Sequence, residues 1–411
     1  MNRFLTMFVI SNQLKLCFCL LFYSHSLISQ SILENTLKRN SPKLLNVISN
    51  LKEHEVQVLL TQIERDSLGN PIFHEESFNV DESIYFYPAS TVKLAISILS
   101  LQKIRELNRN GILITAETPF EIRDKNRKII ILEDGSHPNN KLTISHLIKK
   151  IFLFSDNDSY NYLFDFLGVD YINSELCKRG LHNTFIYHKF LKNSDNLSTW
   201  EYTFLKSNGD ILFHQKSILS NSNRNNKHLE GVFKGEAYLK NDNLIEGPMD
   251  FSLKNRISVR DLQGILKRLI FPEVFPESFQ FNITKNDYDF IKFWMSRTSL
   301  ENDDLIYNNI NVWDSYNKFF IYGDTKGEMN NNIRIYNKVG SAYGTVTDVS
   351  YIHDKKNNIE FFLTATILNN LNGIFNDDIY EDELVGIPFL AELGRTVHEL
   401  LIKDLNDPIN E

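Results

Sequence analysis

Residues 87–93 read Tyr-Pro-Ala-Ser-Thr-Val-Lys, and apolar residues follow them at helical spacing as far as Ile104. Proline is tolerated at the start of a helix, so this stretch predicts a long buried helix that begins at about Ser90. Residues three apart share one face of a helix, which sets the Ser90 hydroxyl beside the Lys93 amine at the positive end of the helix dipole. This stretch therefore contains both the start of a buried helix and two neighbouring polar side chains, a hydroxyl and an amine.

This serine and lysine suit the roles of a nucleophile and its base. A serine hydroxyl is a weak nucleophile until a neighbouring base takes its proton, and apolar surroundings can lower the pKa of a lysine enough for that task. The spacing alone also suits a capping serine followed by a solvated lysine. Lys93, however, lies inside the apolar run 92–96, where a solvated lysine would be out of place. We interpret Ser90 as the candidate nucleophile and Lys93 as the candidate base.

A second polar segment, residues 155–157 (Ser-Asp-Asn), ends a predicted helix over 142–154. The Ser155 hydroxyl could relay a proton to a leaving group, and the Asn157 amide could bind a substrate carbonyl. An ordinary turn at a helix end is the alternative interpretation. The same tripeptide recurs at 194–196. We favour the first copy, because apolar helices flank it and the second copy lies in a polar stretch without periodicity.

A third segment, residues 338–341 (Lys-Val-Gly-Ser), comes at the end of a predicted strand. Lys338 can add positive charge to a pocket and attract a substrate carboxylate, while Gly340 lets another backbone approach the strand closely. The free N–H groups of Ser341 and Ser90 would then be the two donors of an oxyanion hole.

The order and spacing of the three segments resemble the serine β-lactamase and penicillin-binding protein superfamily, most closely the class A β-lactamases and related exported serine hydrolases. The likeness extends to residues 87–93, 155–161 and 338–348. It covers roughly 50–190 and 255–405, and the segment between them is expanded by insertion.

The resemblance implies an exported serine hydrolase that forms an acyl-enzyme on β-lactam or related amide and ester carbonyls. Ser90 would attack the carbonyl, Lys93 would take its proton and Ser155 would pass a proton to the leaving nitrogen. Asn157 and Lys338 would hold the substrate. Two alternatives stay open: a cell-wall D,D-peptidase or esterase, and a penicillin- or peptidoglycan-binding module that is acylated without efficient turnover.

Two departures from the family pattern limit what can be carried over. The family usually has Thr or Ser where this chain has Val339, so a hydroxyl that would meet the substrate carboxylate is missing. Class A enzymes also carry a Glu, followed four residues later by Asn, which positions the deacylating water. Between residues 190 and 207 the only Glu is Glu201, and the residue four positions on is Leu205. We therefore expect weak or different turnover.

Strand patterns near both ends of the chain predict the fold class, α/β in the form of an α+β sandwich. An antiparallel sheet built from both termini, with helices packed on it, would hold an inserted helical lobe. We expect the α/β lobe over 30–95 and 325–411, and the helical lobe over 96–324 with an expanded insertion at about 190–255.

The N-terminus has the features of a secretory signal peptide over residues 1–29. Arg3 and Lys15 precede a short apolar run, and small residues follow it. The run is shorter than the ~20 residues that span a bilayer, although a retained single anchor is the alternative. Cleavage would leave Cys177 as the one cysteine, so the mature protein would have no internal disulfide. We expect a periplasmic or secreted protein with no stable membrane insertion.

The composition and the absence of certain motifs exclude several classes of partner. The 411 residues are 42% hydrophobic and carry a formal net charge of -8, which argues against a disordered chain and against nucleic acid as a partner. The 11 histidines form no His-Glu-x-x-His motif, and no Cys cluster or glycine-rich phosphate loop is present. We therefore expect no cofactor and no metal, and the resemblance implies a small-molecule substrate, a β-lactam or a peptidoglycan-like peptide.

Overall fold

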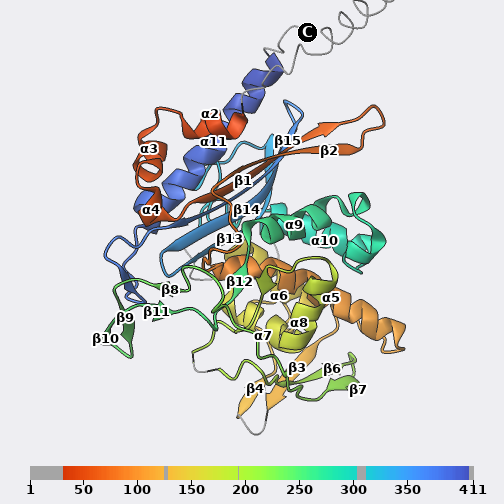
Figure 1. Ribbon diagram of the computed structural model, residues 1–411. Coiled ribbons are helices and arrows are strands. Elements are labelled where there is room, and N and C mark those ends of the chain that lie inside the picture. Colours follow the sequence, from red (N-terminus) through yellow and green to blue (C-terminus); the bar gives the residue numbers. More distant parts are fainter. Residues whose placement is uncertain (1–30, 125–127, 193, 303–311, 407–411) are drawn as a thin grey trace, which may run out of the picture.

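The computed structural model describes residues 31–124, 128–192, 194–302 and 312–406 (Figure 1). The predicted signal peptide over 1–29 lies outside the described residues. The described part of the chain opens with three short helices, α2 (Ile32–Leu37), α3 (Pro42–Ile48) and α4 (Leu51–His54).

The central element is a five-stranded antiparallel sheet built from the two ends of the chain, in the order β13-β14-β15-β1-β2. Its strands are β1 (Gln57–Arg65), β2 (Pro71–Phe78), β13 (Ile333–Ala342), β14 (Thr345–Asp354) and β15 (Ile359–Leu368). β1 and β2 form a hairpin, in whose turn the Asp66 carboxylate accepts from the Leu68 and Asn70 amides and Gly69 adopts a φ of 83°. Both termini therefore contribute to one sheet, as predicted.

Two hydrophobic cores lie on opposite faces of this sheet. On one face α11 (Ile387–Asn406) and the N-terminal helices pack on alternate residues of β15, such as Phe361 and Leu363. Phe362 points the other way and packs with the helical core, where α9 contacts β1, β14 and β15. The period-2 alternation of β15 thus separates the two cores.

The helices between β2 and β13 pack into the larger core. They are α5 (Lys93–Arg109), α6 (Ile144–Phe154), α7 (Asn157–Leu167), α8 (Val169–Lys178), α9 (Val259–Ile270) and α10 (Lys285–Ser296). α6 begins where Thr143 accepts from the His146 amide at 3.2 Å. α5 follows one 3₁₀ turn, Ala89–Val92, and is buried along most of its length, so it forms the axis of the helical region.

Short strands that periodicity did not predict lie between β2 and β13, and one more, β16, follows β15. They form sheets in the orders β4-β3-β6-β7, β10-β9-β16, β11-β8 and β12-β5. Their bounds are β3 (Phe120–Asp124), β4 (Ile129–Ile131), β5 (Thr184–Phe185), β6 (Glu201–Leu205), β7 (Ile211–Gln215), β8 (Phe233–Lys234), β9 (Ala237–Lys240), β10 (Asn243–Glu246), β11 (Met249–Asp250), β12 (Arg256–Ile257) and β16 (Ile374–Phe375). Most have two to five residues, too few for a period to be detected.

The α+β fold class is confirmed: an antiparallel sheet carries helices on both faces (Figure 1). Within the described part of the chain, no helix has the length and apolar character needed to cross a bilayer.

Candidate active site

Ser90 lies in the 3₁₀ turn that leads into α5. The residue before it, Ala89, has a φ of 47°, a left-handed conformation that is costly for a residue with a side chain. Ser90 is half-buried and lines a large cavity. Among the residues that the structure describes, none forms a hydrogen bond with the Ser90 hydroxyl. The hydroxyl therefore faces the space where a substrate would bind.

Lys93 begins α5 and is completely buried. Its Nζ donates to Asn157 Oδ1 at 2.7 Å, to the Ser155 carbonyl, and more weakly to Ser155 Oγ at 3.4 Å. Burial lowers the pKa of Lys93 well below its usual value, and the positive charge of Lys338 acts in the same direction, against the opposing effect of Asp156. Burial therefore favours the neutral form of Lys93, which is the form that a base needs.

Residues 155–157 form the joint between α6 and α7. Ser155 adopts a φ of 53° and ends α6, while Asp156 caps α7 by accepting from the Ser159 amide at 2.7 Å. Because these backbone conformations are fixed, Ser155 and Asn157 both reach Lys93. The helix-end turn and the polar site are one and the same feature.

Lys338, on β13, completes the cluster from the sheet. Its buried Nζ donates to Ser155 Oγ at 2.8 Å and to the Val339 carbonyl at 2.8 Å. Burial lowers the pKa of Lys338 to about 7; the Asp348 carboxylate opposes this effect and the Lys318 charge adds to it. Ser155 Oγ therefore lies between two lysine amines.

Gly340 allows β13 to approach the turn that carries Ser90. A Cβ at this position would lie 2.7 Å from the Pro88 carbonyl oxygen, 2.9 Å from the Ser90 nitrogen and 3.0 Å from the Thr91 nitrogen. Backbone cannot move aside as a flexible side chain can, so only glycine fits. The next residue, Ser341, lines the cavity on the same side as Ser90.

Sequence reasoning missed a buried polar network behind Lys338. Lys318 Nζ donates to Asn337 Oδ1 at 2.7 Å and to the Met295 carbonyl at 2.7 Å, and Asn337 Nδ2 donates to Asp348 at 3.1 Å. Burial also lowers the pKa of Lys318 to about 7 and raises that of Asp348 above its usual value. No short motif marks these residues, because strand pairing and a loop bring them together.

A second group that the sequence did not indicate is the aromatic wall facing Lys93. The Phe190 amide donates to Asn161 Oδ1 at 2.7 Å, and its ring stacks on Tyr160 with a centroid distance of 4.4 Å. Lys93 Nζ lies 5.2 Å from the centre of the Phe190 ring. Glu201, the acid considered from the sequence, lies on β6 and is not among the residues that line the cavity.

The second Ser-Asp-Asn copy lines the same cavity but forms a local turn. Ser194 Oγ donates to Asn196 Oδ1 at 2.9 Å, and the same oxygen accepts from the Lys189 amide at 3.0 Å. Neither side chain hydrogen-bonds to Lys93 in the described part of the chain. The structure thus brings together Ser155, rather than Ser194, with the two lysines.

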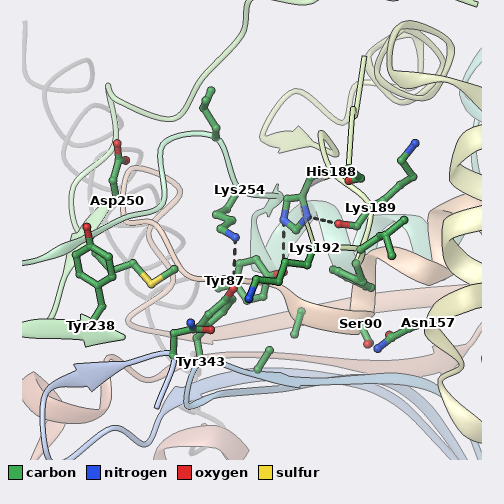
Figure 2. Close-up of a pocket in the computed structure, with 18 of the residues that line it drawn as sticks. Tyr87, Ser90, Asn157, His188, Lys189, Lys192, Tyr238, Asp250, Lys254 and Tyr343 are labelled. Atoms are coloured by element: carbon green, nitrogen blue, oxygen red, sulfur yellow. Dashed lines mark hydrogen bonds between the residues drawn. The ribbon is translucent and has the colours of Figure 1, made fainter. Parts of the chain in front are cut away.

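The cavity has a volume of about 1210 Å³. Figure 2 shows Ser90 and Asn157 at one end, Tyr238 and Asp250 at the other, and Lys254 between them. His188 also lines it; burial lowers the pKa of His188 to about 4, so its ring is neutral near pH 7. No group of His, Cys, Asp and Glu suited to a metal ion occurs among the described residues.

A family model described as "Beta-lactamase enzyme family" (Beta-lactamase2) matches residues 43–397. The chain belongs to this family. A search of curated proteins finds no match.

Among solved structures, PBP-A has a similar fold. PBP-A is 13% identical, with a TM-score of 0.50, and the match covers 91% of this chain and 97% of PBP-A. The β-lactamase of Sphaerobacter thermophilus is 13% identical with a TM-score of 0.45 over 90% of this chain and 96% of that one. The β-lactamase of Streptomyces albus G is 13% identical with a TM-score of 0.47, over 89% and 99%.

Proposed function

We propose that this protein is an exported serine hydrolase that forms an acyl-enzyme at Ser90, and that a β-lactam is the first substrate to test. The observation that carries the proposal is the chain of hydrogen bonds from Lys93 through Ser155 to Lys338, beside a serine hydroxyl that faces an open cavity. A neutral lysine and a hydroxyl relay are what nucleophilic attack on an amide requires.

In the proposed acylation step, the Ser90 oxygen bonds to the substrate carbonyl carbon and its proton passes to Lys93 Nζ. The amide N–H groups of Ser90 and Ser341 stabilise the oxyanion, as the close approach at Gly340 allows. When the C–N or C–O bond breaks, Ser155 gives its proton to the leaving atom and regains one from an adjacent lysine ammonium. Each proton then has a donor and an acceptor.

We further propose that the acyl-enzyme is hydrolysed slowly. Hydrolysis needs a separately positioned water and a group to activate it. The wall beside Lys93 is the Phe190 ring, which cannot accept a proton. Glu201 is not proposed for this role, because it pairs with the β3 and β7 strands of a separate small sheet.

The two alternatives draw support from different features. A cavity of about 1210 Å³ exceeds the ~300–1,000 Å³ usual for small ligands, which favours a longer cell-wall peptide or ester. The Phe190 wall favours a module that is acylated without efficient turnover. Export remains a proposal that rests on residues 1–29 alone.

Intact-mass measurement after incubation with a penicillin tests the proposal. We expect one adduct per chain in the wild type and none in Ser90→Ala. With a chromogenic cephalosporin we expect a burst near one equivalent and then a slow steady rate. No adduct with either ligand would contradict the β-lactam assignment, and burst-free rapid turnover would contradict slow deacylation.

A further inference from the structure

The far half of the cavity is built by the expanded insertion. Its strand β9 pairs in parallel with β16, which lies between β15 and α11. Asn376 Nδ2 adds a bond to the Leu239 carbonyl at 2.9 Å, and Lys234 forms an ion pair with Glu55. The insertion is therefore fixed to the sheet region at several points, and its cavity-lining residues are held in place.

Lys254 and Lys192 are insertion residues that line the cavity, and Lys254 lies between its two ends (Figure 2). Its Nζ donates to the Tyr343 hydroxyl at 3.3 Å and lies 5.3 Å from the centre of that ring. Its carbonyl accepts from Asn226 Nδ2 at 2.8 Å, and its amide donates to the carbonyl of Phe251, which is fully buried. Both the backbone and the side chain of Lys254 are thus positioned before any ligand arrives.

Lys254 has no carboxylate partner within residues 31–124, 128–192, 194–302 and 312–406. Lys189, by contrast, lies on the same cavity wall and pairs with Asp165 at 2.7 Å. A half-buried ammonium without a counter-ion gives up hydration and gains little in return, so an anion placed beside it would be stabilised.

The floor of this region is aromatic. The Tyr343 ring packs edge-on against Tyr87 at 5.1 Å and against Phe251 at 5.4 Å. Tyr343 follows Ser341 by two residues, so Lys254 contacts a residue that is close in the chain to the predicted oxyanion donor. A ligand whose carbonyl lies at Ser90 and Ser341 has Lys254 within the same cavity.

We propose that Lys254 binds a carboxylate of the substrate, in a subsite that the insertion adds to the cavity. This inference rests on the proposed function in one respect, because it places the reacting carbonyl at Ser90. Val339 offers no hydroxyl to such a carboxylate, and Lys254 of the insertion would supply a polar group in its place.

The test compares benzylpenicillin with its methyl ester, which removes the carboxylate charge and keeps the reacting ring. In Lys254→Met we expect acylation by the acid to fall about tenfold, which corresponds to the loss of one good charged contact, and acylation by the ester to stay within twofold. Lys254→Arg retains the preference for the acid. Lys227→Met, a change of equal charge at an exposed insertion residue outside the cavity lining, changes neither rate.

Non-covalent affinities of the acid and the ester, measured in Ser90→Ala and in Ser90→Ala with Lys254→Met, separate the two proposals. A preference for the acid that Lys254→Met removes supports the subsite even if the wild type is never acylated. Equal losses for acid and ester, or no preference for the acid in either format, would overturn the role of Lys254. Labelling of Ser90 by a neutral fluorophosphonate reports on the nucleophile alone.

Discussion

The tripeptide Ser-Asp-Asn occurs twice in this chain, and both copies contribute residues to the same cavity: Asn157 from the first, Ser194 and Asn196 from the second. The copy at 155–157 joins two buried helices, and its side chains contact Lys93 and Lys338. The copy at 194–196 forms a turn whose side chains bond to each other and to a neighbouring backbone amide. Identical residues acquire different chemistry because the elements around them fix different partners.

The largest effect is expected from Ser90→Ala, which asks whether a serine of either copy can replace the nucleophile. We expect complete loss of labelling by a fluorescent penicillin or a fluorophosphonate. The Ser90 hydroxyl forms no hydrogen bond in the described part of the chain, so its loss should cost less than about 1 kcal/mol of stability. Residual labelling mapped to Ser155 or Ser194 would show that one of these serines, and not Ser90, is the nucleophile.

Of the two copies, Lys93 contacts only the first, so replacing Lys93 removes a contact that distinguishes them. Lys93→Ala should slow acylation by several powers of ten, and Lys93→Arg should not restore it, because a guanidinium stays protonated and cannot act as a base. Stopped-flow labelling measures both rates. Equal rates for arginine and lysine at this position would refute the proton-transfer role.

Paired alanine variants compare the two copies directly. Ser155→Ala should reduce acylation about a hundredfold, because it removes the hydroxyl between the two lysines. Ser194→Ala should leave the rate within a factor of a few and serves as the matched control. The opposite ranking of the two variants would mean that the second copy is the one that takes part in the chemistry.

The last prediction concerns the pH dependence of stability at Lys338, which contacts the first copy. Burial lowers the pKa of Lys338 to about 7 in the folded state, against 10.5 for an exposed lysine, so between these values the unfolded chain binds the extra proton. Stability should therefore rise with pH from about 7 to 10, by up to about 1.4 kcal/mol per pH unit from this lysine. Denaturant titrations of wild type and Lys338→Met measure this slope. If stability rises equally steeply with pH in the variant, a group other than Lys338 causes the pH dependence.

Several strands and helices of the fold can be predicted from local sequence patterns. Alternation over 359–368 predicts a strand with two different faces, and the apolar spacing over 142–154 predicts the helix that ends at Ser155. The clustering of Lys93, Ser155 and Lys338 came from the family resemblance rather than from any spacing, because these residues lie on three separate elements.

The rest of the site depends on contacts that no local pattern records. Phe190 and Lys254 reach the cavity from loops, and Lys318 reaches Asn337 across a loop and a strand. Strands of two residues, such as β8 and β11, show no alternation at all. The N-terminal helices and α10 also went unpredicted, since their stability depends on packing against a sheet that forms elsewhere.

The bond between Lys338 and Ser155 joins residues that are 183 positions apart in the chain. A nascent polypeptide emerging from the ribosome, or threading through an export channel, would carry Ser90 and Lys93 long before β13 exists. Until the last third of the sequence has been made and has docked at Gly340, Lys93 lacks the neighbouring ammonium and the relay lacks its second lysine. In the proposed mechanism, the proton relay is therefore complete only after β13 has packed against the turn that carries Ser90.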